Sequence, residues 1–246
     1  MFARLRRAVY LLLCLAVATA VFTFYYDRYL WDPNNVAPTF GGDGLTIHYN
    51  MQYHASYGEG VELTNQYYPY VESIFLTDAQ AVVSVVLATL RPVIPRIGDF
   101  AVGISNALIH WSNVVSVLLL YLIFRRLKLP VTASLLFGLL IAMLSPQIAR
   151  QLGGQYSLGY TFLLPLILYY QLLAASDRRY WPASLGVGIV IVVLGLNNPY
   201  LFAIGVSFLL ATTVIASVVR LTGDNTFHWR TIRHWASVSV GSAAVI

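Results

Sequence analysis

Long apolar stretches separated by short polar segments dominate the chain. A transmembrane helix needs about 20 mostly apolar residues, and the first such run extends from Ala8 to Tyr26. Further spans are predicted at Phe100 to Phe124, Val131 to Ser145, Leu158 to Ala175, Ala183 to Leu196 and Tyr200 to Val219, with another beginning near Trp235. This pattern predicts an all-α integral membrane protein, a polytopic transmembrane helix bundle with a long first outer loop. Since the last apolar run stops at Ile246, we expect the chain to be the N-terminal part of a longer protein.

The apolar pattern divides the chain into three segments. We predict an N-terminal transmembrane anchor at residues 1–26, an outer periplasmic loop at 27–99 and a helix bundle at 100–246. The anchor also resembles a signal peptide, with arginines before the apolar run and Ala18-Thr19-Ala20 as a cleavage site. Its apolar run continues through Tyr26, which favours an uncleaved anchor.

The stretch at residues 79–95 is apolar from Ala81 to Leu90 but is interrupted by Arg91, Pro92 and Pro95. If it crossed the membrane, every later loop would change sides and the basic clusters would lie outside. We therefore predict a short interfacial helix here, within the outer loop, because irregular backbone at membrane depth has to be covered by protein.

Composition and charge agree with a membrane protein. Hydrophobic residues make up 58% of the chain and charged residues 10%, and the mean hydropathy is +0.69. The net charge of +5 does not indicate nucleic-acid binding, because the basic residues occur in short clusters between apolar runs rather than on one stripe. The single cysteine, Cys14, excludes a disulfide within the chain.

The basic clusters predict the orientation, because Lys and Arg concentrate on the cytoplasmic side of membrane proteins. With the N-terminus in the cytoplasm, the cytoplasmic residues are Arg4, Arg6, Arg7, Arg125, Arg126, Lys128, Arg178, Arg179, Arg220, Arg230 and Arg233. The residues placed outside are only Arg28, Arg91, Arg96 and Arg150. We expect a multi-pass protein of the bacterial cytoplasmic (inner) membrane, with the lipid bilayer as its first partner.

Nearly all carboxylates of the chain lie between residues 27 and 99, interleaved with tyrosines. Aromatic faces beside carboxylates suit sugar rings, although tyrosines near a bilayer also mark its interface. Glycines on both sides of Asp43 let the backbone turn sharply. Asp43 is therefore a candidate general base or ligand of a divalent cation, or simply a turn former. His48 is a candidate ligand or proton carrier, or a packing residue.

Polar residues inside the spans are also candidates. Asn106, His110 and Asn113 are spaced by roughly one helical turn and share a face of their predicted helix. Hydrogen bonding between helices is favoured for them over direct contact with a substrate.

Four motifs resemble those of a bacterial membrane protein group within the GT-C class of polytopic glycosyltransferases, which use lipid-linked sugar donors. They are Gly42-Asp43-Gly44-Leu45, Tyr68-Pro69-Tyr70-Val71-Glu72, Phe75-Leu76-Thr77-Asp78-Ala79-Gln80 and Leu144-Ser145-Pro146-Gln147-Ile148-Ala149-Arg150. The resemblance implies that Asp43, the acidic residue of the first outer loop, is the catalytic base or a metal-associated group. Such relatives often have Gly-His-Tyr where this chain has Gly154-Gln155-Tyr156, and Gln155 cannot carry a proton near neutral pH.

These observations lead to the hypothesis of an inverting glycosyl transfer at the outer face, with a polyprenyl-phosphate-linked sugar as donor. Asp43 is the expected catalytic residue, and a divalent cation is a candidate cofactor. The expected substrate-binding residues are His48, Tyr68, Glu72, Asp78, Arg150 and Gln155. Arg150 suits the donor phosphate through a bidentate contact, or is an ordinary interfacial arginine. The alternatives are a transporter or flippase for a lipid-linked saccharide and a non-catalytic envelope-assembly protein.

Overall fold

A computed structural model describes residues 2–26, 31–36, 43–63, 72–77, 79–176 and 181–223. Most of these residues are helical, as the apolar pattern predicts. The span expected near Trp235 lies outside the described residues. The chain divides into two compact units, Met1–Phe162 and Leu163–Ile246, and each is described by itself.

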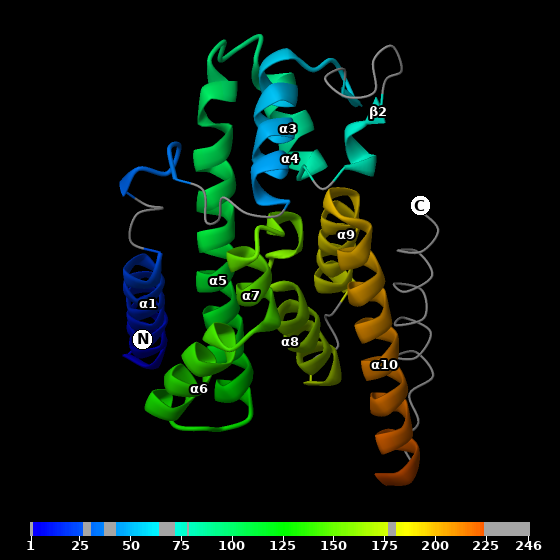
Figure 1. Ribbon diagram of the computed structural model, residues 1–246. Coiled ribbons are helices and arrows are strands. Elements are labelled where there is room, and N and C mark those ends of the chain that lie inside the picture. The colour runs from blue at the N-terminus through cyan, green and yellow to red at the C-terminus, as the bar shows by residue number, and fades with distance from the viewer. Residues whose placement is uncertain are drawn as a thin grey trace. The chain divides into compact units, whose positions relative to one another are not determined.

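Three apolar helices pack together in the first unit (Figure 1): α1 (Phe2–Tyr25), α5 (Ala101–Arg126), which runs the height of the unit, and α6 (Val131–Met143). α5 packs against both α1 and α6. Gly138 permits the close approach of α6, because a Cβ there would lie 3.3 Å from the carbonyl oxygen of Val117 on α5. The N-terminal end of α1 and the C-terminal end of α5 lie at the same end of the unit. The basic clusters on these two helix ends therefore share one side.

The predicted span at Val131 to Ser145 corresponds to α6, and the chain bends directly after it. α6 ends at Met143 and is followed by α7 (Pro146–Leu152), with a bend of 46° between the two helices. Proline fits the first turn of a helix but cannot continue the preceding one. The pair is therefore either one broken span or a re-entrant segment.

The described part of residues 27–99 is folded and mainly helical. Its elements are α3 (Gly44–Tyr57), β1 (Glu62–Leu63), β2 (Glu72–Ser73), η1 (Ile74–Leu76), α4 (Ala81–Leu90) and η2 (Ile97–Phe100). The two short strands pair antiparallel. A buried cluster that includes Met51, Leu63, Ile74 and Leu87 forms the core of this part. α4 falls inside the stretch predicted as an interfacial helix.

Hydrogen bonds attach this folded part to the helices below it. Gln80 precedes α4 with a left-handed backbone conformation, φ 50°. Its buried side chain donates to Ser105 Oγ of α5 at 2.5 Å and accepts from Tyr160 Oη at 2.8 Å. At the other end of α4, Arg91 donates to the carbonyl oxygen of Gly58 at 3.2 Å. These contacts fix α3 and α4 over α5.

The polar residues of α5 bind other segments of the first unit. Asn106 Nδ2 donates to the carbonyl oxygens of Pro33 and Val36 at 2.7 and 2.9 Å. Asn113 Nδ2 donates to Tyr26 Oη at 3.3 Å. Asn113, which also bonds to Gln151 of α7, thus makes the predicted hydrogen bond between helices, whereas Asn106 bonds to the segment at residues 31–36.

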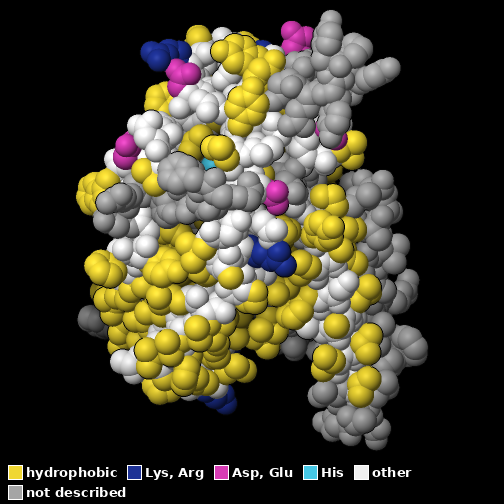
Figure 2. All heavy atoms as spheres, viewed as in Figure 1, with side chains coloured by type: hydrophobic (Ala, Val, Ile, Leu, Met, Phe, Trp, Pro, Cys, Tyr) yellow, Lys and Arg dark blue, Asp and Glu magenta, His cyan; other side chains and the backbone are white. Residues whose placement is uncertain are grey.

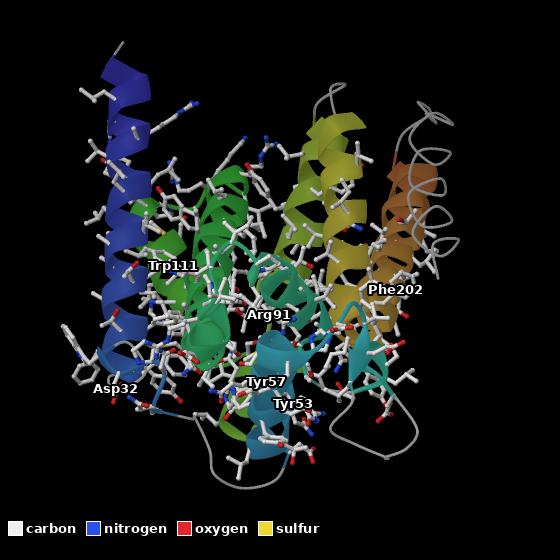
Figure 3. The ribbon with its side chains drawn as sticks, turned by 90° about the horizontal axis from the view of Figure 1, so that it is seen from above. Asp32, Tyr53, Tyr57, Arg91, Trp111 and Phe202 are labelled. Atoms are coloured by element: carbon white, nitrogen blue, oxygen red, sulfur yellow. The ribbon has the colours of Figure 1, made fainter. Side chains whose placement is uncertain are left out.

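The second unit contains α8 (Leu163–Ser176), α9 (Trp181–Asn197) and α10 (Pro199–Gly223), which pack against one another. The turn between α9 and α10 is tight, and a Cβ on Gly195 would lie 2.7 Å from Cβ of Phe202. Figure 3 labels Phe202 on α10. The predicted helices at Ala183 to Leu196 and Tyr200 to Val219 are therefore present.

Within the described residues, three helical runs are long and apolar enough to cross a membrane: Leu5–Tyr25, Ile97–Arg126 and Tyr156–Leu173. The bent pair α6 and α7 would make a fourth, while α4, Leu185–Asn197 and Pro199–Ile215 are shorter apolar helices. On the face that Figure 2 shows, hydrophobic side chains cover the lower part of the first unit, and the coloured acidic side chains lie above that part. The protein thus has the features of a multi-pass membrane protein.

Candidate functional site

Asp43 lies directly before the first turn of α3. Its backbone carbonyl oxygen accepts a hydrogen bond from Ile47 N at 2.9 Å. Its side chain is exposed and makes no capping hydrogen bond to the helix. The carboxylate is therefore turned to the surface rather than used to stabilise the helix end. Gly41 and Gly42, on its N-terminal side, lie outside the described residues.

The first turns of α3 pack against η3 (Tyr156–Leu158) and α5. Ile47, Ile109 and Tyr156 form one buried cluster. The next residue, His48, is only 4% exposed, and its ring lies 4.4 Å from that of Tyr156, centroid to centroid. This cluster positions the Asp43 end of α3 against the segment that contains Gln155.

His48 is a buried histidine whose ring nitrogens both lack a hydrogen-bond partner in the structure. Burial lowers its pKa to about 4, because a charged imidazolium is poorly solvated in such surroundings. His48 is therefore neutral at physiological pH, and one ring nitrogen can donate and the other accept a hydrogen bond. A neutral, buried imidazole does not supply the positive charge that would bind a phosphate.

Arg150 and Gln155 lie together on the other side of this contact. Arg150, near the end of α7, donates from Nη1 to Gln155 Oε1, and Gln155 N donates to the carbonyl oxygen of Arg150 at 2.9 Å. Between them, Gly154 has a φ of +83°, a conformation that favours glycine. Gln155 is thus an acceptor that orients an exposed guanidinium.

A buried polar network lies behind Arg150. The next residue, Gln151, is fully buried and accepts from Tyr26 Oη, at the end of α1. It exchanges hydrogen bonds with the Asn113 amide of α5 at 3.1 and 3.2 Å and donates to the carbonyl oxygen of Gly159. A Cβ on Gly159 would lie 2.7 Å from Cγ of Gln151. The network joins α1, α5, α7 and the segment after η3.

The predicted site residues are only partly brought together. The packing of Ile47 and His48 on Tyr156 joins the helix that begins after Asp43 to the segment that contains Gln155, and Gln155 in turn bonds to Arg150. Glu72 is a half-exposed residue of β2, paired in register with Leu63, and no contact joins it to this group. Tyr68 and Asp78 lie outside the described residues. Among the described residues, no three His, Cys, Asp or Glu side chains gather to hold a metal ion.

Tyr156 and Gln151 also belong to this region, although the sequence pattern did not identify them as site residues. Tyr156 is the last residue of the motif Gly154-Gln155-Tyr156. Its place next to the candidate Gln155 could have identified it as part of the site. Gln151 offered a second signal, since an amide inside an apolar segment requires hydrogen-bond partners. The partners themselves, Tyr26 and Asn113, are far away in sequence and follow only from the fold.

Comparison with known proteins gives a family but no relative of known structure or activity. Searches of curated proteins and of solved structures found no match to the chain. A family model described as a domain of unknown function, DUF6311, matches residues 14–246. That match covers the described helices of both units almost completely. The chain belongs to the DUF6311 family.

Proposed function

We propose that this protein is a GT-C-like membrane glycosyltransferase that transfers a sugar from a polyprenyl-phosphate-linked donor at the outer face of the membrane. The observation that supports it best is the packing of the Asp43 end of α3 on η3, beside the Arg150–Gln155 pair. This arrangement provides one exposed carboxylate and one oriented guanidinium on segments that contact each other. A glycosyl phosphate needs both kinds of group, a base for the acceptor and a cation for the leaving phosphate.

The proposed orientation has the N-terminus in the cytoplasm of a bacterial cell and α3 on the periplasmic side. Support comes from the arginines at the start of α1 and the end of α5, which lie at one end of the first unit. Basic residues favour the cytoplasmic side. The acidic side chains visible in Figure 2 lie away from that end.

In the proposed reaction the Asp43 carboxylate removes the proton from an acceptor hydroxyl. The hydroxyl oxygen forms a bond to the anomeric carbon of the donor sugar from the face opposite the phosphate. The bond between that carbon and the phosphate oxygen breaks, and polyprenyl phosphate leaves with the electron pair. The configuration at the anomeric carbon is inverted, and one proton has passed to Asp43.

Arg150 binds the donor phosphate in this proposal, because a guanidinium contacts phosphate oxygens bidentately. Gln155 keeps the guanidinium in place. His48, whose ring nitrogens are both buried, supports α3 in this proposal through its packing on Tyr156.

The test is sugar transfer by purified protein in proteoliposomes, with radiolabelled glucose, mannose and galactose each on polyprenyl phosphate and membrane glycans as acceptor. We expect Asp43→Asn to lower transfer by about a hundredfold or more, the usual contribution of a general base. Asp32→Asn is the matched control, because Asp32 is another exposed acid of the same segment, bonded to Asn35 at 2.8 Å. Transfer by Asp43→Asn at the wild-type rate would remove Asp43 as the base. Movement of the donor across the bilayer without transfer would favour a flippase.

A further inference from the structure

Three tyrosines form a continuous row along one face of α3. Tyr49, Tyr53 and Tyr57 are four residues apart, a spacing that places side chains above one another on a helix. The ring centroids of Tyr49 and Tyr53 are 6.1 Å apart, and those of Tyr53 and Tyr57 are 5.3 Å apart. Tyr49 is 57% and Tyr57 70% exposed. Figure 3 shows Tyr53 and Tyr57 together on α3.

The rest of this face is uncharged, with the exposed Leu45 one turn before Tyr49. Its other well-exposed positions within α3 include Thr46 and Gln52, and no charged side chain occurs between Gly44 and Tyr57. The opposite face of the helix is covered, because Ile47, Met51 and Ala55 are buried. From Tyr49 to Tyr57 the row extends about 12 Å, at 1.5 Å per residue. The row begins in the middle of α3 (Gly44–Tyr57), with Tyr49 about 9 Å along the helix axis from Asp43, and it ends at the C-terminal end of the helix.

Another surface of the same folded part has the opposite character. The exposed side of α4 and the turn after it is aliphatic, with Val86, Leu90, Val93 and Ile94. Such a surface suits the hydrocarbon boundary of a bilayer. The α3 face has aromatic rings with hydroxyl groups and amides instead, which make a poorer hydrocarbon contact and a better contact with polar, uncharged molecules.

We propose that Tyr49, Tyr53 and Tyr57 bind the neutral sugar residues of a saccharide acceptor. Tyrosine offers a large, rigid contact area at low entropic cost together with a polar group. The rings stack on the C–H faces of sugars, and the phenol and amide groups bind sugar hydroxyls. The absence of charge on the face fits a neutral glycan rather than a phosphate. The inference rests on the proposed function, whose acceptor it identifies as a saccharide.

The direct test is binding of fluorescently labelled maltotetraose, cellotetraose, chitotetraose and mannotetraose to the protein in nanodiscs, followed by fluorescence polarisation. We expect binding of at least one of these, weakened about tenfold by Tyr53→Ala, the loss of about 1.4 kcal/mol. Tyr53→Phe should retain most of it, because the ring remains. Tyr200→Ala, which removes an exposed tyrosine of α10, is the control. The proposal would be overturned if none of the four tetrasaccharides binds, or if Tyr200→Ala weakens the binding as much as Tyr53→Ala does.

A second measurement tests whether this face is buried in the membrane instead. A spin label on Gln52→Cys, with Cys14→Ser, should be relaxed more by a water-soluble nickel complex than by oxygen. The matched label on Val86→Cys should show the reverse preference. Equal preference of both labels for oxygen would place the α3 face in lipid and overturn the proposal.

Failure of this inference can be distinguished from failure of the proposed function. Asp43→Asn should bind the tetrasaccharides normally while it loses sugar transfer. Binding without any transfer by the wild type would support the tyrosine surface and remove the transferase reaction. If Tyr53→Ala leaves sugar transfer unaffected and none of the tetrasaccharides binds, the transferase reaction would be supported and the tyrosine surface would be removed.

Discussion

At the scale of single residues, His48 shows how burial determines what a side chain can do. A histidine in the outer segment was a candidate proton carrier by composition alone. The structure packs it under Tyr156, where its pKa is lowered to about 4 by desolvation. A group that is neutral at physiological pH binds through hydrogen bonds and not through charge.

The lowered pKa of His48 predicts a pH dependence of stability. Between the ordinary value of 6.5 and about 4, the unfolded chain binds a proton at this position and the folded chain does not, so the free energy of unfolding falls as the pH falls. From about pH 7 to about pH 5 the loss is about 2 kcal/mol for this residue. His48→Phe should keep the ring packing and reduce this slope, as measured by thermal unfolding in detergent.

The remaining slope in His48→Phe should come partly from His54, whose pKa is also lowered, chiefly by burial. The matched variant is His54→Phe, which should remove a separate part of the pH dependence. An unchanged slope in His48→Phe would mean that His48 is accessible to protons in the folded protein. The buried position described here would then be wrong.

At the scale of elements, α7 is short and depends on the polar network behind it. Gln151 connects it to α1 through Tyr26 and to α5 through Asn113. Gln151→Leu would leave these partners unsatisfied inside the protein, at a cost of about 1–2 kcal/mol. The midpoint of thermal unfolding in detergent should fall, whereas Gln52→Leu, at an exposed position of α3, should leave it unchanged.

A double variant provides the contrast for this network. Because Asn113 and Gln151 bond to each other, Asn113→Ala and Gln151→Leu should destabilise less in combination than the sum of their separate effects. Strict additivity of the two changes would contradict a shared network.

The apolar helices could be predicted from the sequence, whereas α3, which combines polar and apolar residues, could not. The predicted span at Phe100 to Phe124 corresponds to α5, Ala101–Arg126, because a run of apolar residues bounded by arginines leaves little ambiguity. The sequence predicts a loop where α3 lies, because tyrosine, asparagine and histidine are spread along this segment and some of them are buried. Only the spacing of Ile47, Met51 and Ala55 signals a helix there. The packing of Tyr156 on α3 depends on long-range contacts that no local pattern contains.

At the scale of the whole molecule, charge and hydropathy are arranged together. The apolar helices α1 and α5 have basic residues at one end, and the acidic residues of the chain lie almost entirely in the segment that contains α3 and α4. This asymmetry was readable in the sequence, because it depends only on the order of spans and loops. The proposed site requires it, since Asp43 and Arg150 must face the compartment opposite the basic clusters.

Labelling of single cysteines tests this arrangement most directly. In a Cys14→Ser background, Thr46→Cys lies at the start of α3 and Leu127→Cys directly after α5, and both positions are exposed. A membrane-impermeant maleimide added to spheroplasts, which lack the outer membrane, should modify Thr46→Cys and should reach Leu127→Cys only after the inner membrane is permeabilised. Modification of Leu127→Cys but not Thr46→Cys in intact spheroplasts would contradict the orientation and the site together.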